Sequence, residues 1–240
     1  MAETYRFALV GNPNVGKSSL FNALTGLHQH TGNWPGKTVA TAAGTCSIDG
    51  AAVELIDLPG TYSLSARSPE EEVAAEYISF GCADAVIVVC DATALERNLY
   101  IALQVMEITD HVVVCVNLMD EAGKRGITVD LPRLSQLLGV RVVGTSARQK
   151  KTLPPLLRAA VAAAQERHRK PVPVRYGEAI EAGLFSIEAR LDELLPGSIP
   201  NHRWIAMQLL TGGDITIRAL EKKLGRPLEE DPFLSEAVRL

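Results

Sequence analysis

One eight-residue stretch constrains the fold of this chain more than any other: Gly11-Asn12-Pro13-Asn14-Val15-Gly16-Lys17-Ser18. It fits the pattern G-x-x-x-x-G-K-[ST], in which glycines let the backbone curl so that its N–H groups converge on phosphate oxygens. The apolar run before it, Phe7–Val10, predicts a strand, and Ser19–Leu24 after it predicts a helix. A glycine turn would match the pattern by accident in roughly one in a hundred chains of this length. The strand–loop–helix context therefore favours a phosphate-binding loop at a helix N-terminus.

Bulk composition indicates an ordinary globular protein. The chain has 240 residues, 47% hydrophobic and 22% charged, with a formal net charge of −4. This acidic balance argues against a nucleic-acid partner, which a basic face would attract. The cysteines are scattered, and Cys90 and Cys115 lie inside apolar runs as small buried hydrophobes would. With no apolar core of a signal peptide and no run long enough to cross a bilayer, we expect a reduced, cytoplasmic setting.

Strands alternate with helices over the first part of the chain, which predicts a doubly wound α/β fold. Two runs, Ala85–Cys90 and Val112–Val116, are nearly all apolar and β-branched, as expected of parallel strands buried on both faces. The six strands expected are Tyr5–Val10, Thr41–Ile48, Val53–Ile56, Ala85–Cys90, Val112–Val116 and Arg141–Val143. The expected helices are Lys17–Thr25, one from Pro69 capped by Ser68, Leu95–Thr109 and Leu153–Arg169. Ligands of such folds bind at the carboxyl ends of the strands.

Prolines at Lys170-Pro171-Val172-Pro173 break the last of these helices and begin a second region without strand-like alternation. We therefore predict two domains, residues 1–170 and residues 171–240, the second small and all-helical. Its expected helices are Glu178–Leu195, Asn201–Leu210, Ile215–Leu224 and Pro232–Leu240, separated by glycine-containing turns.

Several polar residues fit the binding of a magnesium nucleotide. Lys17 would supply charge to the β- and γ-phosphates, and the Ser18 hydroxyl would be a Mg²⁺ ligand. Asp57-x-x-Gly60 follows a predicted strand, so the carboxylate can hold Mg²⁺ through water and the Gly60 N–H can sense a γ-phosphate. Thr38 would be the second hydroxyl on Mg²⁺. A simple turn explains the Asp57 motif equally well, and a strand-edge threonine explains Thr38.

A second group of residues fits recognition of a guanine base. Asn117-Leu118-Met119-Asp120 ends a predicted apolar strand, and the Asp120 carboxylate can accept from both guanine N1–H and the 2-amino group. Ser146 and Ala147 follow the last predicted strand, where a backbone N–H can meet the guanine oxygen. Each motif alone is weak, and helix capping by Asp120 is the alternative. Their order along the chain, each at a strand end, makes them indicative together.

These residues resemble the translation-factor-like GTPases and, more narrowly, the FeoB family of bacterial ferrous-iron transporters. The resemblance covers about residues 5–150. It is carried by the loop Gly11–Ser18, Gly32-Asn-Trp-Pro-Gly36 with Thr38-Val39, Asp57-Leu-Pro-Gly-Thr-Tyr-Ser-Leu64, Ser68-Pro-Glu-Glu71 and Asp91-Ala-Thr-Ala-Leu-Glu-Arg-Asn-Leu-Tyr100. It implies a P-loop NTPase G domain with a mostly parallel six-stranded sheet, then a helical domain that slows GDP release, then a membrane permease outside this chain. GTP, GDP and that permease region are the implied partners, a homo-oligomer is left open, and the implied place is the cytoplasmic side of a bacterial inner membrane.

The resemblance also implies roles for individual residues. Gly11 to Ser18, with Ser19, would hold the phosphates; Gly36, Lys37 and Thr38 would form the first switch, with Thr38 on Mg²⁺. Asp57 to Gly60 would open the second switch, and Asn117, Met119, Asp120, Ser146 and Ala147 would bind the base. Asn14, with carbonyls near Asn33 and Trp34, would bind a K⁺ ion that neutralises charge as the γ-phosphate leaves. The implied catalytic set is Lys17, Asn14, Thr38 and Gly60.

Two positions depart from the common GTPase pattern. Thr61 stands where Ras-like enzymes carry a water-orienting glutamine, and it is too short to replace that side chain, so we expect slow intrinsic hydrolysis. Leu118 stands where many GTPases have a lysine packed on the base, so we expect guanine preference with somewhat reduced affinity. Two alternatives stay open: an RNA- or ribosome-associated GTPase, and a scaffold that binds GTP with negligible turnover.

Overall fold

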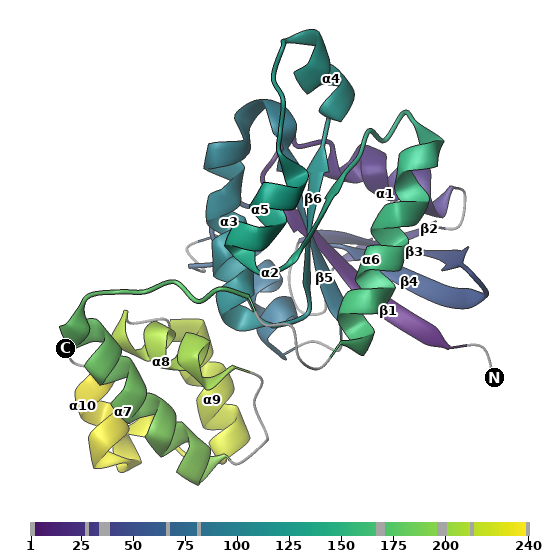
Figure 1. Ribbon diagram of the computed structural model, residues 1–240. Coiled ribbons are helices and arrows are strands. Elements are labelled where there is room, and N and C mark those ends of the chain that lie inside the picture. Colours follow the sequence, from purple (N-terminus) through teal and green to yellow (C-terminus); the bar gives the residue numbers. More distant parts are fainter. Residues whose placement is uncertain are drawn as a thin grey trace. The chain divides into compact units, whose positions relative to one another are not determined.

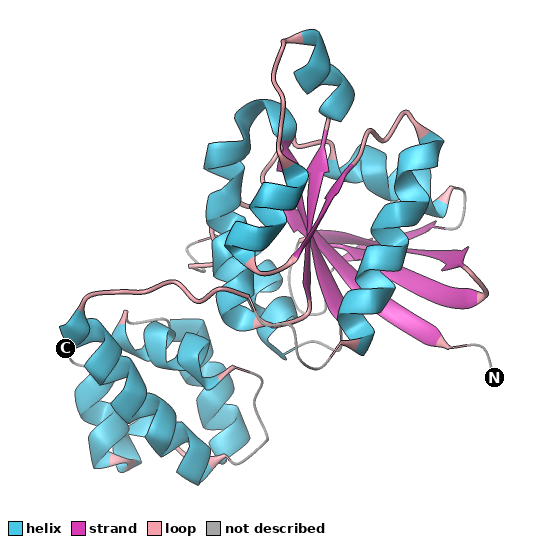
Figure 2. Ribbon diagram, viewed as in Figure 1, coloured by secondary structure: helices cyan, strands magenta, loops and turns pink. Residues whose placement is uncertain are grey.

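The computed structural model describes residues 3–26, 29–33, 39–65, 68–80, 83–166, 171–195, 201–211 and 214–238. The chain divides into two units, Met1–Val172 and Pro173–Leu240. The first unit contains a sheet with helices on both faces, and the described part of the second contains helices without strands (Figure 1, Figure 2).

A seven-stranded sheet forms the centre of the first unit, in the order β2-β3-β4-β1-β5-β6-β7. Five neighbouring strands, from β4 to β7, run parallel to one another. The other two are antiparallel additions, because β3 pairs antiparallel with β4 and β2 antiparallel with β3. The bounds are β1 Thr4–Gly11, β2 Gln29–Asn33, β3 Ala40–Ile48, β4 Ala51–Asp57, β5 Ala85–Asp91, β6 Val112–Asn117 and β7 Arg141–Gly144.

The central strands follow from their composition. All six residues of β6 are buried, as are the first six of β5, because helices cover both faces of the sheet. Since β1, β4, β5, β6 and β7 are parallel, the loops that follow them emerge at one edge of the sheet. That edge carries the loops after Gly11, Asp57, Asn117 and Gly144, which hold the predicted motifs.

Helices α1 and α6 lie on one face of this sheet, and α3 and α5 lie on the other (Figure 1). The bounds are α1 Lys17–Thr25, α2 Pro69–Phe80, α3 Leu95–Ile108, α4 Met119–Lys124, α5 Leu131–Leu138 and α6 Leu153–Gln165, with short 3-10 helices η1 Ala92–Ala94 and η2 Lys150–Thr152.

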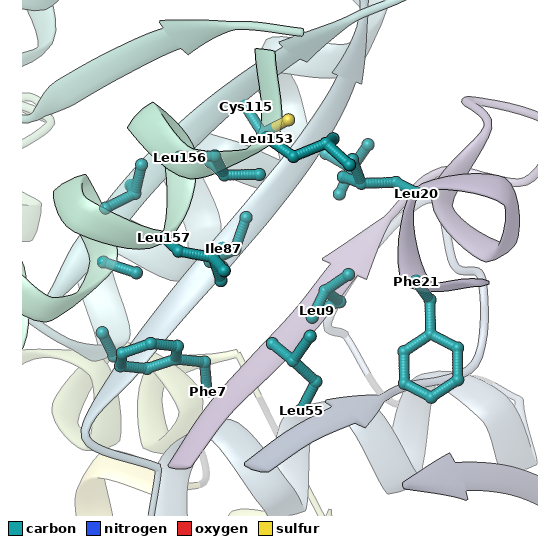
Figure 3. Packing of buried hydrophobic residues seen from close by; sticks show 14 of the residues in the cluster. Phe7, Leu9, Leu20, Phe21, Leu55, Ile87, Cys115, Leu153, Leu156 and Leu157 are labelled. Carbon is teal, nitrogen blue, oxygen red and sulfur yellow. The ribbon is translucent and has the colours of Figure 1, made fainter. Parts of the chain in front are cut away.

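The main hydrophobic cluster fills the space under α1 and α6. Figure 3 shows Leu20 of α1 and Leu156 of α6 facing the side chains of the central strands, which include Leu9 and Ile87. Cys115 belongs to this cluster and Cys90 is also fully buried, which confirms that both are small core residues. This packing fixes α1, and with it the loop that leads into α1, against the sheet.

The six predicted strands are confirmed, with ends shifted by a few residues, but the predicted number of strands is wrong. The seventh, β2, lies in a stretch for which no strand was predicted. Its sequence, Gln-His-Thr-Gly-Asn, lacks apolar alternation because an edge strand is held by backbone pairing with one neighbour rather than by burial.

Two helices also differ from the expectations. Helix α5 was not predicted, although Asp130 caps it by accepting from the Arg133 N–H at 2.9 Å and Gly139 ends it with φ 73°. Helix α6 ends at Gln165, earlier than predicted, because Glu166 is extended.

The second unit begins after Val172. Trp204 is buried, and the Asn201 side chain caps the second helix by accepting from the Arg203 N–H at 3.1 Å. Arg190 in the first helix donates at 2.7 Å to Asp231, the residue directly before the last helix. Nowhere in the described residues is there a helix long and apolar enough to cross a membrane. The bounds are α7 Glu178–Leu194, α8 His202–Leu210, α9 Asp214–Leu224, η3 Leu228–Glu230 and α10 Pro232–Val238.

Candidate nucleotide-binding site

A pocket of about 520 Å³ opens where the loop after β1 meets the loop after β4. Seven of its lining residues come from the stretch between β1 and the first turn of α1, and Gly60 comes from the other side. The lining residues are Asn12, Pro13, Asn14, Gly16, Lys17, Ser18, Ser19 and Gly60. The structure thus brings most of the predicted phosphate-binding residues to one cavity at the N-terminus of a helix, where anions are favoured.

Backbone geometry explains the residue types of this loop. Asn14 and Gly16 have φ values of 67° and 78°, in the left-handed region. A Cβ on Gly16 would also lie 2.7 Å from Asn117 Nδ2, and a Cβ on Gly11 would lie 2.4 Å from the Val89 carbonyl oxygen. Both contacts are shorter than real side chains tolerate, so only glycine fits where the loop crosses β5 and β6. Val15 is buried within the loop.

Lys17 and Asp57 form a partly buried ion pair at the base of the pocket, with side chains 8% and 13% exposed. The Lys17 ammonium also donates to the Leu58 carbonyl oxygen at 2.5 Å. Burial raises the pKa of the Asp57 carboxyl above its ordinary value, and the neighbouring Lys17 ammonium opposes that shift. Lys17 lines the cavity together with Ser18, and the Asp57 carboxylate is joined to the site through its ion pair with Lys17.

The predicted base-binding residues come together at the ends of β6 and β7. Asn117 Nδ2 donates to the Val15 carbonyl oxygen at 3.0 Å, and Thr145 Oγ1 donates to Asn117 Oδ1 at 3.1 Å. The Met119 N–H donates to the Thr145 carbonyl oxygen at 3.1 Å. The second and third contacts join the ends of β6 and β7, whereas the first reaches back into the phosphate loop.

Asp120 follows in the first turn of α4, and its backbone N–H donates to Ser146 Oγ at 3.1 Å. Hydrogen bonding with Ser146 lowers the pKa of the Asp120 carboxyl, so this side chain is an ionised acceptor at neutral pH. Leu118 adopts a left-handed conformation with φ 60°, which turns the chain from β6 into α4. Ala147 lies next to Ser146, partly exposed.

Three predicted residues, Gly36, Lys37 and Thr38, lie outside the described residues, as does Trp34. Asn12 was predicted among the phosphate-binding residues and lines the pocket, but the sequence interpretation did not anticipate that its side-chain oxygen is buried without a hydrogen-bond partner within the described ranges. It also missed the Leu58 carbonyl as an acceptor for Lys17, because a backbone role leaves no residue-type signal.

Comparisons with known proteins agree with this geometry. A family model described as ferrous iron transport protein B matches residues 5–160. A fusion of Fe(2+) transport protein A and Fe(2+) transporter FeoB from Porphyromonas gingivalis is 39% identical over 232 residues, which is 95% of this chain and 26% of that protein. The Fe(2+) transporter FeoB of Escherichia coli K12 is 37% identical over 227 residues, 92% of this chain and 28% of that protein. The chain thus spans about a quarter of the length of these relatives.

Solved structures match both units. The cytosolic domain of the T. maritima FeoB iron transporter in a GDP form is 36% identical with a TM-score of 0.84, covering 100% of this chain and 96% of that one. The same domain in a GMPPNP form has a TM-score of 0.83, with 98% and 96% covered. The G domain of that transporter, solved by itself, is 42% identical with a TM-score of 0.64, covering 68% of this chain and all of that one.

Proposed function

Because this chain belongs to the ferrous iron transport protein B (FeoB) family, we propose that it is a GTP-binding and GTP-hydrolysing switch that regulates Fe²⁺ uptake. The uptake itself would occur through a membrane permease region outside this chain, which covers about a quarter of its relatives. The relatives' description as Fe(2+) transporters supports the cargo, and the cytosolic domains among the solved structures support a place on the cytoplasmic side.

One contact carries the nucleotide part of the proposal: the hydrogen bond from Asn117 to Val15 at 3.0 Å. It holds the end of β6, which directly precedes Leu118 to Asp120, against the phosphate loop. Asp120 is an ionised acceptor suited to guanine, and the loop is suited to phosphate. The two sites would then bind the base and the phosphates of one nucleoside triphosphate at the same time. Adenine lacks the two donors that Asp120 would accept from, so GTP is favoured over ATP.

The phosphate end of the pocket fits a magnesium nucleotide. Ser18 and Asp57 offer the hydroxyl and carboxylate oxygens that Mg²⁺ prefers, with Thr38 proposed as a further ligand. Bound Mg²⁺ would neutralise charge on the β- and γ-phosphates. Lys17 would exchange its contact with Asp57 for phosphate oxygens, and the Gly60 N–H would face the γ-phosphate.

We further propose that hydrolysis is slow and that K⁺ stimulates it. The Thr61 side chain is 3% exposed and its hydroxyl donates to the Ser63 carbonyl oxygen at 2.7 Å, so it does not reach a hydrolytic water. The exposed Asn14 lines the pocket and carries an amide oxygen of the kind that holds a monovalent cation. A cation there would offset charge that develops as the γ-phosphate leaves.

The helical unit is proposed to slow GDP release. A relative's G domain has been solved without its helical part, so residues 1–172 can be tested against the full chain. We expect faster GDP dissociation from the shorter chain, measured with a fluorescent GDP analogue. Equal rates would remove this role and leave the nucleotide site untouched.

Calorimetry with Mg²⁺ tests the central claim: we expect uptake of GTP and GDP but not of ATP. Turnover should be higher in K⁺ than in Na⁺, and Asn14→Ala should abolish that difference. Asn22→Ala, the same change at an exposed position of α1 that does not line the pocket, is the matched control. Equal binding of ATP and GTP would overturn the proposal, and K⁺-independent turnover would overturn only the cation site.

The buried Thr61 hydroxyl also favours a second candidate, a scaffold that is gated by GTP without useful turnover. Single-turnover kinetics distinguish the two. Release of phosphate from bound GTP supports the enzyme, and a nucleotide that stays intact over hours supports the scaffold.

A further inference from the structure

The segment directly after Gly60 is anchored to a helix that contributes nothing to the pocket itself. The Leu64 N–H donates to the side-chain oxygen of Gln104 in α3 at 2.8 Å, across 40 positions of the chain. The Leu64 side chain is fully buried, which fixes the same residue a second time. The backbone of this segment is thus held from α3 rather than from the phosphate loop alone.

Arg97 provides a second anchor on the same helix. It precedes Gln104 by seven residues, or about two turns, so both side chains lie on one side of α3. Its guanidinium carbon lies 4.7 Å from the centre of the Tyr62 ring, a cation–π contact. Tyr62 is 47% exposed, so this contact is not a by-product of core packing. Arg97 and Gln104 of α3 therefore each contact one residue of the segment.

Between these anchors and Gly60 lies Thr61, whose N–H and hydroxyl both donate to backbone carbonyl oxygens. Its N–H donates to the Gly11 carbonyl oxygen at 3.2 Å, and its hydroxyl donates to Ser63. The Thr61 side chain therefore does not orient a water toward the pocket. The loop after β4 thus contributes the backbone of Gly60 to the γ-phosphate end of the pocket, and the position of Gly60 depends on the segment that follows it.

We propose that Gln104 and Arg97 are positioning residues for GTP hydrolysis, which hold residues 61–65 so that the Gly60 N–H faces the γ-phosphate. This inference rests on the proposed function. GDP has no γ-phosphate and makes no use of the Gly60 N–H. Loosening the anchors should therefore lower turnover and the affinity for a GTP analogue while leaving GDP affinity unchanged.

The first test replaces Gln104. Gln104→Met keeps the length of the side chain but removes the acceptor, and it leaves the Leu64 N–H unsatisfied. We expect a fall in single-turnover rate of about tenfold, with a weaker GMPPNP affinity and a GDP affinity within twofold of the wild type. Gln104→Glu retains an acceptor oxygen and should restore the rate. Gln136→Met, the same change on an exposed position of α5, is the matched control.

The second test uses a double-mutant cycle at Arg97 and Tyr62. Arg97→Gln and Tyr62→Leu should each lower the rate about threefold, and the double variant should be no slower than either one. Tyr62→Phe keeps the ring and should retain most of the rate.

Three results would overturn the assignment: a Gln104→Met rate equal to that of Gln136→Met, equal weakening of GDP and GMPPNP, or no rescue by Gln104→Glu. A wild-type chain that binds no guanine nucleotide would overturn the proposed function as well. The two failures are therefore distinguishable, because the first occurs with normal GDP binding.

Discussion

The side-chain amide of Asn117, at the end of β6, donates to the carbonyl oxygen of Val15 in the phosphate loop across 102 positions of the chain. Thr145 holds the other end of that amide by donating to its oxygen. Asn117 and Thr145 are both fully buried, so no water competes for these bonds. One side chain thus joins the predicted base site to the predicted phosphate site.

Replacing Asn117 with alanine should weaken GTP and GDP together. The Val15 carbonyl and the Thr145 hydroxyl would both lose a partner in a buried setting, at about 1–3 kcal/mol each. We expect at least a tenfold loss of affinity for either nucleotide by calorimetry. Asn98→Ala removes another buried asparagine, which donates to the Ala94 carbonyl oxygen of η1 at 2.7 Å, and should cost stability without changing affinity. Equal affinities for the two variants would contradict the proposed role.

Asp120→Asn should change base preference rather than abolish binding. The amide presents a donor where guanine also presents donors, so GTP affinity should fall by more than about tenfold. Xanthine carries an oxygen in place of the 2-amino group, so XTP should now compete better than GTP. Displacement of a fluorescent nucleotide by GTP and XTP measures the switch. Glu121→Gln, the neighbouring carboxylate paired with Lys124, is the control and should leave the preference as it is.

Gly16→Ala and Gly26→Ala make a matched pair at the two ends of α1. Both positions have positive φ, 78° and 62°. Gly16 lies in the left-handed helical region with ψ 18° and Gly26 lies outside it with ψ −123°, so alanine should cost about 1 kcal/mol in backbone strain at Gly16 and more at Gly26. Only at Gly16 would the new methyl meet a neighbour, Asn117 Nδ2 at 2.7 Å, whereas nothing lies within 4 Å at Gly26. The melting temperature should therefore fall for both variants, and the nucleotide affinity should fall for Gly16→Ala alone. Normal affinity in Gly16→Ala would show that the loop has room to shift.

The helical unit should lose stability in acid through Glu181. Arg203 donates to both Glu181 oxygens, at 3.0 and 2.8 Å, and this contact lowers the pKa of the carboxyl to about 2. A depressed pKa contributes stability above the unfolded value, near 4.5, and that contribution disappears as the pH falls toward 2. Glu181→Gln should therefore have a lower melting temperature than the wild type at pH 7. This difference in melting temperature should disappear as the pH falls from about 4.5 to 2. Glu178→Gln, in the same first turn, is the control. A gap that does not depend on pH would contradict the ion pair.

The sequence was informative at positions where the backbone geometry requires a particular residue type. Gly16, Lys17, Asp57 and Asn117 could be placed at strand ends because apolar runs precede each motif, and the parallel sheet brings those ends to one edge. Edge strand β2 was missed, since its pairing leaves no trace in side-chain polarity.

Other features depended on contacts between distant positions. The Gln104–Leu64 bond joins residues 40 positions apart, and neither residue type is unusual at its place in the chain. The short helix α5 is a different kind of miss, because the Asp130 cap and the Gly139 stop were both visible in the sequence.

The position of β2 at the edge of the sheet has a consequence for the order in which the fold can unfold. β2 is joined to β3 alone, through five residue pairs, whereas β1 is clasped by β4 and β5 on either side. Separation of β2 from the sheet would break only its backbone pairing with β3 and would leave the strands next to the P-loop in place. The amides of Gln29–Asn33 should accordingly exchange with deuterium long before those of β1, so the first event of unfolding would begin at the rim, next to the residues proposed as the first switch.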